Sequence, residues 1–142
     1  EYNCRFGDPE TQVVLPLLKS DLFEIMLKIS DKNLKKEDVQ FMDKSAACVV
    51  MASDGYPVSY EKGFEITLPA LDKDEEIYIA GAKKKDGKIV TDGGRVLGAV
   101  KVADTLKDAV DGAYALAEKI HFDNAYMRSD IGKKALCAKV EE

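Results

Sequence analysis

The sequence lacks the features that mark several classes of protein. Its 142 residues include three cysteines with no CxxC or CxxH spacing, so neither a disulfide framework nor a zinc site is indicated. No apolar run approaches the roughly 18 residues that a membrane-spanning helix requires. The first residues do not have the pattern of a secretory signal. These absences favour a reducing, cytosolic compartment and no membrane partner.

A concentrated positive charge is also missing. The chain has 26 acidic and 21 basic residues, a net charge of −5, and the two signs are interspersed. Without a basic block, nucleic acid is a poor candidate partner. The apolar and charged fractions, 46% and 33%, are those of a soluble globular protein. The length suits one domain, or a small domain with part of another, and the immediate start on a strand at Glu1 predicts a fragment of a longer protein.

The first third of the chain has helical character after an opening strand. Residues 1–6 predict a strand, and Pro9 after Asp8 predicts a helix start, with Asp8 as the cap. Pro16 interrupts the apolar stretch that follows. From Ser20, a second helix is predicted with one apolar face, formed by Leu22, Ile25, Met26 and Ile29. The polar segment SDKNLKKEDVQ then predicts a domain boundary or a loop.

The remainder has mainly β character. Asp86-Gly87 predicts a tight hairpin, and Gly93-Gly94 predicts a further turn. Strands are predicted for AACVVMAS, GFEIT, EIYIAGAKK, KIVT and RVLGAVKVA. A helix of about residues 106–120 follows, capped by Thr105 with Asp108, and its apolar face consists of Leu106, Ala109, Val110, Ala113, Leu116 and Ile120. Within it, Gly112 is expected to permit a close backbone contact.

The opening strand carries the best candidates for chemistry. Side chains alternate along a strand, so Glu1, Asn3 and Arg5 share one face. A carboxylate and an amide oxygen suit Mg²⁺, and an arginine beside them suits phosphate. The turn Gly7–Glu10 adds a helix N-terminus, which favours anions. By geometry alone, an ordinary edge strand with a polar face is the favoured interpretation, because a three-residue polar face is a weak motif.

Other candidates have simpler structural explanations. The lone His121 follows a helix and is expected to pack or to cap the helix end. Arg95, after two glycines, is either a phosphate contact or, as favoured here, a surface arginine at a turn. Residues 83–85, all lysine, are expected at a solvated hairpin end. Arg128 and Asp130 either close over a site or pair with each other, and pairing is preferred.

The opening EYNCRFGDPETQ, continued by LPLLKSDL, resembles the end of the ATP-grasp domain of the phosphoribosylamine–glycine ligase family, also called glycinamide ribonucleotide synthetase. The pieces SDGYPVSYEKGFEI, AGAKKKDGKIVTDGGRVL, IHF and YMRSDIGKKAL follow in that family's order and spacing. The resemblance covers essentially the whole chain. It implies an ATP-dependent ligase of purine biosynthesis that joins glycine to 5-phosphoribosylamine through glycyl phosphate.

By this resemblance, Glu1 and Asn3 correspond to ligands of Mg²⁺ or Mn²⁺, and Arg5 to a phosphate-facing catalytic arginine. Asp8 and Glu10 would lie beside the substrates, without individual roles. Asn124 stands where the family often has glycine, which is compatible with left-handed backbone. The family's nucleotide-gripping lysine and a further acidic metal ligand precede this stretch, so the chain alone is expected to be inactive.

The resemblance also implies an α+β architecture in two parts. Residues 1–42 would be the C-terminal remnant of an ATP-grasp domain. Residues 43–142 would be the ligase C-terminal domain, a small antiparallel β domain like a barrel-sandwich hybrid, with packed helices. The alternative is a free-standing binding or carrier module, because related folds carry lipoyl or biotin groups. A carrier needs one defined lysine at a hairpin tip, and the cluster KKKDGK disfavours that function.

Overall fold

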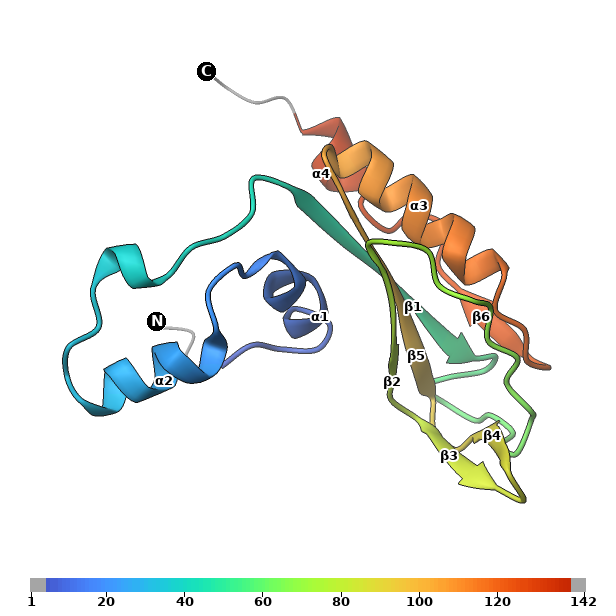
Figure 1. The fold of residues 1–142 in the computed structure, drawn as a ribbon. Helices are drawn as coiled ribbons and strands as arrows, with labels where there is room; N and C mark the ends of the chain where they lie inside the picture. The colour runs from blue at the N-terminus through green and yellow to red at the C-terminus, as the bar shows by residue number, and fades with distance from the viewer. Residues whose placement is uncertain (1–4, 139–142) are drawn as a thin grey trace.

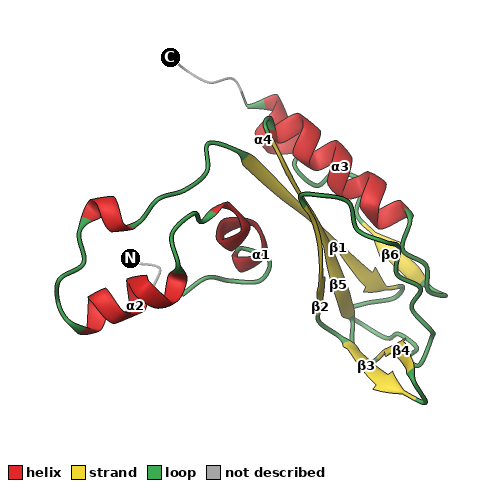
Figure 2. Cartoon of the chain, viewed as in Figure 1, coloured by secondary structure: helices red, strands yellow, loops and turns green. Residues whose placement is uncertain are grey.

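The computed structural model describes residues 5–138 and has the α+β architecture, with antiparallel sheets and a few helices, that the sequence predicts (Figures 1 and 2). The α-helices are α1 (Thr11–Val14), α2 (Leu22–Ser30), α3 (Leu106–Glu118) and α4 (Lys133–Cys137). Two 3₁₀ turns are η1 (Leu15–Leu17) and η2 (Lys36–Asp38). The strands are β1 (Ser45–Ser53), β2 (Glu75–Ile79), β3 (Ala82–Lys85), β4 (Lys88–Thr91), β5 (Arg95–Ala103) and β6 (Ala125–Met127).

One four-stranded antiparallel sheet forms the centre of the molecule. Its strand order is β2-β5-β1-β6, and β3 and β4 form a separate hairpin. The long strands β1 and β5 pair from Ser45 with Ala103 to Met51 with Leu97, and an irregularity then places Ala52 opposite Arg95. Figure 1 shows α3 along one side of this sheet and α1 on the other.

The hydrophobic core lies between the sheet and α3. Alternate residues of β1 point toward α3, and Val49 is completely buried there with Val96 of β5. Small residues of α3 allow the helix to lie close to the strands, and both Ala109 and Ala113 have no exposed surface. The predicted cap is confirmed, because the Thr105 side chain accepts a hydrogen bond from the Asp108 N–H.

Gly112 does not make the backbone contact that the sequence suggested. It faces the aliphatic part of Lys101 on β5, and a Cβ atom at Gly112 would lie 2.7 Å from the Lys101 Cγ. The glycine therefore makes room for a side chain. A long side chain that lies along the sheet excludes a Cβ atom from this space, as a neighbouring backbone would.

Several predicted strands match the structure, and two differ. The hairpin at Asp86-Gly87 is confirmed, with φ of 50° and 80°, the positive values of a type I′ turn. The stretch EIYIAGAKK is divided between β2 and β3 at Gly81, where a Cβ atom would lie 2.5 Å from the Arg95 carbonyl oxygen. The stretch GFEIT forms only isolated bridges, in which Glu65 pairs with Val90 and Thr67 with His121. The short strand β6 was not predicted.

The N-terminal region also departs from prediction at its first helix. Asp8 does not cap α1, because the N-cap is Glu10 and it makes no side-chain capping bond. The Asp8 carboxylate instead contacts the Gln12 side chain and Arg95. Helix α2 is confirmed, and Asp21 caps it by accepting bonds from the N–H groups of the next turn.

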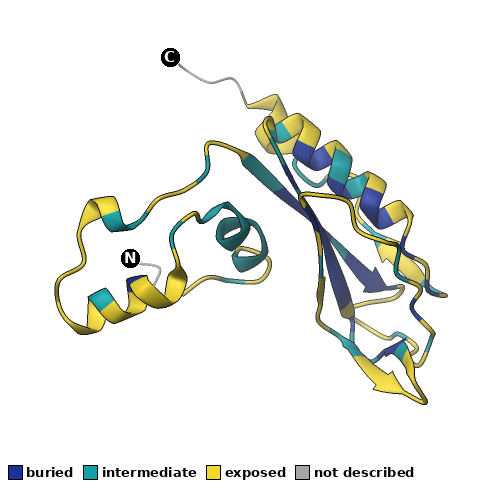
Figure 3. Cartoon of the chain, viewed as in Figure 1, coloured by how far each residue is buried: buried dark blue, intermediate teal, exposed yellow. Residues whose placement is uncertain are grey.

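The apolar face of α2 is only partly covered. Ile25 is buried, whereas the other three residues predicted for this face are exposed in the structure (Figure 3). They are Leu22, Met26 and Ile29. Within residues 5–138, none of the helices has the length and apolar character that crossing a membrane would require.

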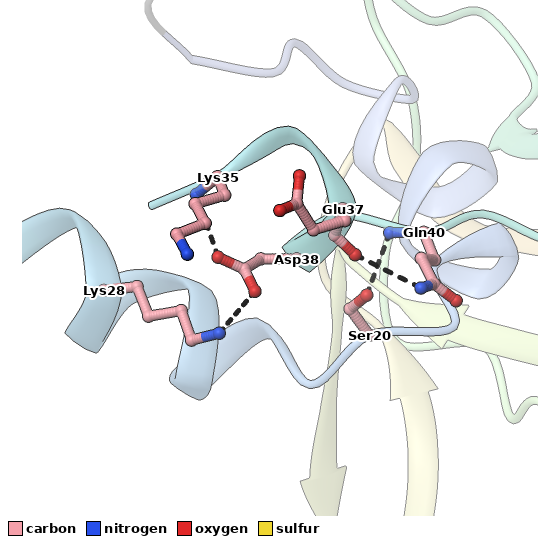
Figure 4. Close-up of polar contacts among 6 residues, drawn as sticks. All are labelled: Ser20, Lys28, Lys35, Glu37, Asp38 and Gln40. Carbon is pink, nitrogen blue, oxygen red and sulfur yellow. Dashed lines mark hydrogen bonds and ion pairs between the residues drawn. The ribbon is translucent and has the colours of Figure 1, made fainter. Parts of the chain in front are cut away.

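Polar contacts hold the loop after α2 against that helix (Figure 4). Lys28 of α2 forms an ion pair with Asp38, and the Lys35 N–H donates to the same carboxylate at 2.9 Å. Farther along, the Gln40 N–H donates to the Ser20 hydroxyl at 2.9 Å. The loop is therefore tied to both ends of the α2 segment. A bridge between Leu18 and Phe41 adds a backbone tie.

The Asp38 contacts predict a pH dependence. Hydrogen bonds from Lys28 and from the Lys35 backbone hold the pKa of Asp38 below its ordinary value. A lowered folded-state pKa stabilises the fold above the unfolded-state value, and this stability is lost as the pH falls through the folded-state pKa. We expect Lys28→Met to raise the pKa of Asp38, measured by NMR titration of the carboxyl carbon. Lys84→Met, on the distant hairpin, should leave it unchanged, and equal titration of Asp38 in both variants would contradict the assignment.

A buried hydroxyl predicts a loss of stability. Thr91 is fully buried, and its hydroxyl accepts bonds from the Gly63 and Phe64 N–H groups at 3.1 and 3.2 Å. Thr91→Val keeps the shape but removes this acceptor, so we expect the free energy of unfolding to fall by about 1–2 kcal/mol. Urea denaturation measures the change. Thr67→Val, at an exposed position, is the matched control, and an equal effect of both substitutions would exclude this role.

Candidate functional site

The structure describes some of the predicted site residues and not others. Glu1 and Asn3 lie outside the described residues, so their assignment as metal ligands stays a prediction. Arg5 is exposed and its Nη1 donates to the Phe6 carbonyl at 3.2 Å. Arg5 and Asp8 both line a cavity of about 390 Å³, together with Gln12 and Tyr78. The structure therefore brings two of the predicted residues to one surface hollow.

Asp8 connects this hollow to the start of β5. One carboxylate oxygen of Asp8 lies 3.0 Å from Nη1 of Arg95, and the other accepts from the Gln12 side chain at 2.6 Å. Both partners of the ion pair are about half exposed, at 46% and 48%. Arg95 therefore lies against the Gly7–Glu10 turn. From the sequence, an ordinary surface arginine was favoured at this position. The Gly-Gly-Arg pattern at a strand start was the available signal.

Glu10 has a different position from Asp8. Its carboxylate accepts a hydrogen bond from the Gly7 N–H and so closes the turn. Glu10 lines a separate cavity of about 260 Å³, beside Pro9 and Val13 and the first residues of β1. The two acidic residues of the turn therefore face different hollows. Glu10 shapes the turn, and Asp8 joins it to β5.

A third cavity, of about 430 Å³, lies on the sheet face away from α3. We call it the two-arginine cavity, because Arg95 and Arg128 are its charged lining residues. Its apolar lining comes from β1 and from the segments on either side of the sheet: Pro9, Cys48, Val50, Ala52 and Ile131. Tyr56 and Tyr126 complete it. The cavity is thus built by residues far apart in the sequence.

The wall that carries Arg128 is fixed by two sets of bonds. Arg128 forms a two-point pair with Asp130, Nε to Oδ1 at 2.8 Å and Nη2 to Oδ2 at 2.7 Å, which confirms the predicted pairing. This pair lowers the pKa of Asp130 and raises that of Arg128. The Tyr114 hydroxyl donates to the Arg128 carbonyl at 2.7 Å and accepts from the Ile131 N–H at 2.9 Å. Helix α3 therefore holds this segment in place.

The opposite wall depends on a glycine. The Tyr56 ring lies directly on Gly94, where a Cβ atom would come within 1.9 Å of the tyrosine Cδ2. Residue 94 precedes Arg95, so this contact sets Tyr56 next to the arginine. The absence of a side chain at Gly94 is what makes room for the aromatic wall. Neither Tyr56 nor Gly94 was predicted from the sequence to belong to a site.

The other residues singled out in the sequence lie outside the three cavities. Residues 83–85 are exposed on the β3-β4 hairpin, as predicted. Asn124 has a φ of 60°, which confirms the left-handed backbone expected there. His121 is exposed, and its backbone pairs with Thr67. Across residues 5–138, no three His, Cys, Asp or Glu side chains are grouped to hold a metal ion.

Cys48 lies in the floor of the two-arginine cavity but is not a nucleophile at neutral pH. Burial raises the pKa of its thiol to about 11, and the nearby negative charge of Asp8 contributes in the same direction. The thiolate is the reactive form, so the thiol form that prevails here is inert. Cys48 therefore serves as a small apolar residue in contact range of Gly98.

With this geometry established, comparison with known proteins places the chain in a family. Residues 46–134 match the family "Phosphoribosylglycinamide synthetase, C domain". The chain therefore belongs to the phosphoribosylglycinamide synthetase family and corresponds to its C-terminal part. The match lies within the second of the two predicted segments, residues 43–142.

Individual relatives extend the likeness beyond the matched domain. A phosphoribosylamine–glycine ligase of Caldanaerobacter subterraneus is 50% identical over 92% of this chain and 31% of its own length. A bifunctional purine biosynthetic protein of Pichia angusta is 50% identical over 98% of this chain and 18% of its own. The crystal structure of phosphoribosylamine–glycine ligase from Thermotoga maritima superimposes with a TM-score of 0.77 at 44% identity, covering 92% of this chain and 32% of that one. The chain thus spans about a third or less of these relatives.

The position of Cys48 predicts its chemical reactivity. In native protein at pH 8, we expect alkylation of Cys48 by iodoacetamide to be at least about tenfold slower than that of the exposed Cys137, and to accelerate as the pH approaches 11. Peptide mapping by mass spectrometry measures both thiols in one sample. Unfolding in guanidinium is the control and should equalise the rates. Equal rates in the native protein would show that Cys48 is accessible and easily ionised.

Proposed function

We propose that this chain is the C-terminal part of an ATP-dependent ligase that joins glycine to 5-phosphoribosylamine, giving glycinamide ribonucleotide, ADP and phosphate. The observation that carries the proposal is the family match together with about 50% identity over nearly the whole chain. The alignment with the Pichia angusta relative covers 98% of the chain and so includes the region that contains Arg5 and Asp8. The ligase reaction belongs to purine biosynthesis, to which the names of the relatives also point.

The proposed reaction has two steps. The glycine carboxylate attacks the γ-phosphorus of ATP, forming glycyl phosphate and releasing ADP. The amine of 5-phosphoribosylamine then attacks the glycyl carbonyl carbon, an amide bond forms, and phosphate leaves with the electrons of the broken C–O bond. Both steps develop charge on phosphoryl or carbonyl oxygens, which positioned positive groups stabilise. Arg5 is the residue of this chain that we assign to that role, with Asp8 and Glu10 shaping the adjoining turn.

The donor chemistry of Glu1 and Asn3 suits a hard cation. A carboxylate and an amide oxygen are ligands of the kind that Mg²⁺ or Mn²⁺ accepts, with further positions left for phosphate oxygens. A bound divalent ion would neutralise charge on the ATP phosphates. We assign residues 1–42 to the end of the ATP-grasp domain, and residues 43–142 to the ligase C-terminal domain, of barrel-sandwich hybrid type.

A chimera tests the proposed function directly. This chain should replace the corresponding C-terminal third of the Thermotoga maritima ligase and retain glycine-, ATP- and phosphoribosylamine-dependent release of ADP. Turnover within about tenfold of the parent enzyme would support the assignment. A chimera that folds, shown by cooperative thermal unfolding, but releases no ADP with all three substrates present would refute it.

The same chimera tests the metal ligands. Glu1→Gln keeps the shape of the side chain and removes its charge, so we expect turnover at limiting Mg²⁺ to fall by about 10²-fold or more. Tyr2→Phe, at the next position of the sequence, is the matched control and should leave turnover nearly unchanged. Full activity of Glu1→Gln at limiting Mg²⁺ would remove the assignment.

The isolated chain provides a complementary prediction. It is expected neither to bind Mg-ATP tightly nor to form glycinamide ribonucleotide, because the resemblance places the nucleotide-gripping residues before Glu1. Isothermal titration calorimetry with Mg-ATP measures the affinity. A micromolar dissociation constant would place the nucleotide site within this chain.

A further inference from the structure

We propose that the two-arginine cavity binds the phosphorylated ribose of the amine substrate, with Arg95 and Arg128 holding its phosphate. This inference rests on the proposed function, because the substrate class follows from the ligase reaction. The cavity itself is defined by the geometry of the described residues alone. It lies beside the Gly7–Glu10 turn and shares the Asp8-Arg95 ion pair with it.

The charge of the lining favours an anion. Arg95 and Arg128 line the cavity, whereas their carboxylate partners Asp8 and Asp130 do not belong to the lining. Each carboxylate therefore holds a guanidinium from outside the cavity. An entering ligand meets two positive groups and no lining carboxylate.

Both guanidinium groups retain donors for such a ligand. A guanidinium carries five N–H donors in a planar fork that matches phosphate oxygens. Arg95 contacts Asp8 through Nη1, and Arg128 contacts Asp130 through Nε and Nη2. The two-point pair with Asp130 fixes the plane of the Arg128 guanidinium, and the single contact with Asp8 restrains Arg95, which reduces the side-chain entropy that binding would otherwise cost.

The rest of the lining fits a sugar ring better than a small amino acid. The floor of Val50 and Ala52 is apolar, and Tyr56 and Tyr126 offer aromatic surfaces with hydroxyl groups at their tips. The volume of about 430 Å³ is within the range of pockets for small organic ligands. Glycine has too few atoms to span both arginines and both tyrosines. Ribose 5-phosphate has a ring for the tyrosines and a phosphate for the arginines.

Two contacts outside the lining hold the arginines in position. Tyr114 of α3 bonds to the backbone on both sides of Asp130, and so fixes the segment that carries Arg128. Gly94 supports the Tyr56 ring directly before Arg95. Tyr114 and Gly94 act as positioning residues in this arrangement.

Titration of the 142-residue chain with ribose 5-phosphate tests the site without ATP, glycine or metal. The readout is NMR spectroscopy of the ¹⁵N-labelled arginine Nε–H groups. We expect saturable shifts of the Arg95 and Arg128 signals with ribose 5-phosphate, weaker shifts with inorganic phosphate and none with ribose. Shifts with ribose equal to those with ribose 5-phosphate, or no shift with ribose 5-phosphate up to 20 mM, would overturn the proposal.

Substitutions of the two arginines test whether these residues provide the affinity for ribose 5-phosphate. Arg95→Met and Arg128→Met should each weaken ribose 5-phosphate binding by about tenfold or more, the loss of a charge-assisted hydrogen bond. Lys107→Met is the matched control, because Lys107 also forms an exposed ion pair, with Asp111 on α3, but does not line the cavity. Arg95→Lys and Arg128→Lys keep the positive charge and remove the planar set of guanidinium N–H donors. They replace the methionine variants in this test if a methionine variant fails to fold. Unchanged affinity in folded arginine variants would overturn the assignment.

The ligase chimera separates this inference from the proposed function. Arg95→Met and Arg128→Met should raise the KM for phosphoribosylamine at least about tenfold, with the KM values for ATP and glycine changed less than twofold. An active chimera whose KM for phosphoribosylamine is unaffected would overturn the cavity assignment and leave the function standing. An inactive chimera, with ribose 5-phosphate still shifting both arginine signals of the chain, would remove the function and support a phosphosugar site.

Discussion

The antiparallel pairing of β1 and β5 is the constraint on which the rest of the structure depends. These two strands of nine residues run side by side through the buried centre, and their register determines which side chains face α3. A shift by one residue would exchange the two faces of β1. Val49 would then leave the core, and Cys48 and Val50 would enter it. The register therefore defines the hydrophobic core and the floor of the two-arginine cavity together.

The irregularity near the end of this pairing has a second effect. Ala52 lies opposite Arg95 because the register shifts after Met51. At that point the Gly81 and Gly93 backbones approach closely, a contact that a Cβ atom on either residue would prevent. Strand β5, which lies between β2 and β1, therefore starts after this close contact, and its first residue lies beside the Gly7–Glu10 turn. The arginine at its first position reaches Asp8 for that reason.

The sequence predicts those parts of the fold whose signals are local. Asp86-Gly87 specifies its own turn, and Thr105 specifies the start of α3, because the bonding partners lie within a few residues. The isolated bridging of GFEIT and the division at Gly81 depend on contacts with distant backbone, which no local pattern encodes.

The same distinction applies to the candidate site. The Arg128-Asp130 pair spans two residues and was predicted, whereas the Asp8-Arg95 pair joins distant segments and was not. Asp8 is of a residue type that commonly caps helices. Its carboxylate instead pairs with Arg95, which lies near Asp8 only in the folded structure. The family resemblance identified the N-terminal residues as important, and it did not indicate the cavity on the far side of the turn.

The sparse burial of α2 has a consequence for the motions of the chain. Of its nine residues, Ile25 is the one whose side chain is buried, and a helix of that length is marginal in water without tertiary support. Helix α3, in contrast, buries five side chains against the sheet. The backbone amides of α2 should therefore exchange with solvent deuterium through local opening, whereas those of α3 and β5 require unfolding of the central sheet. We therefore expect two levels of cooperativity, with the boundary between the loop after α2 and the first residue of β1.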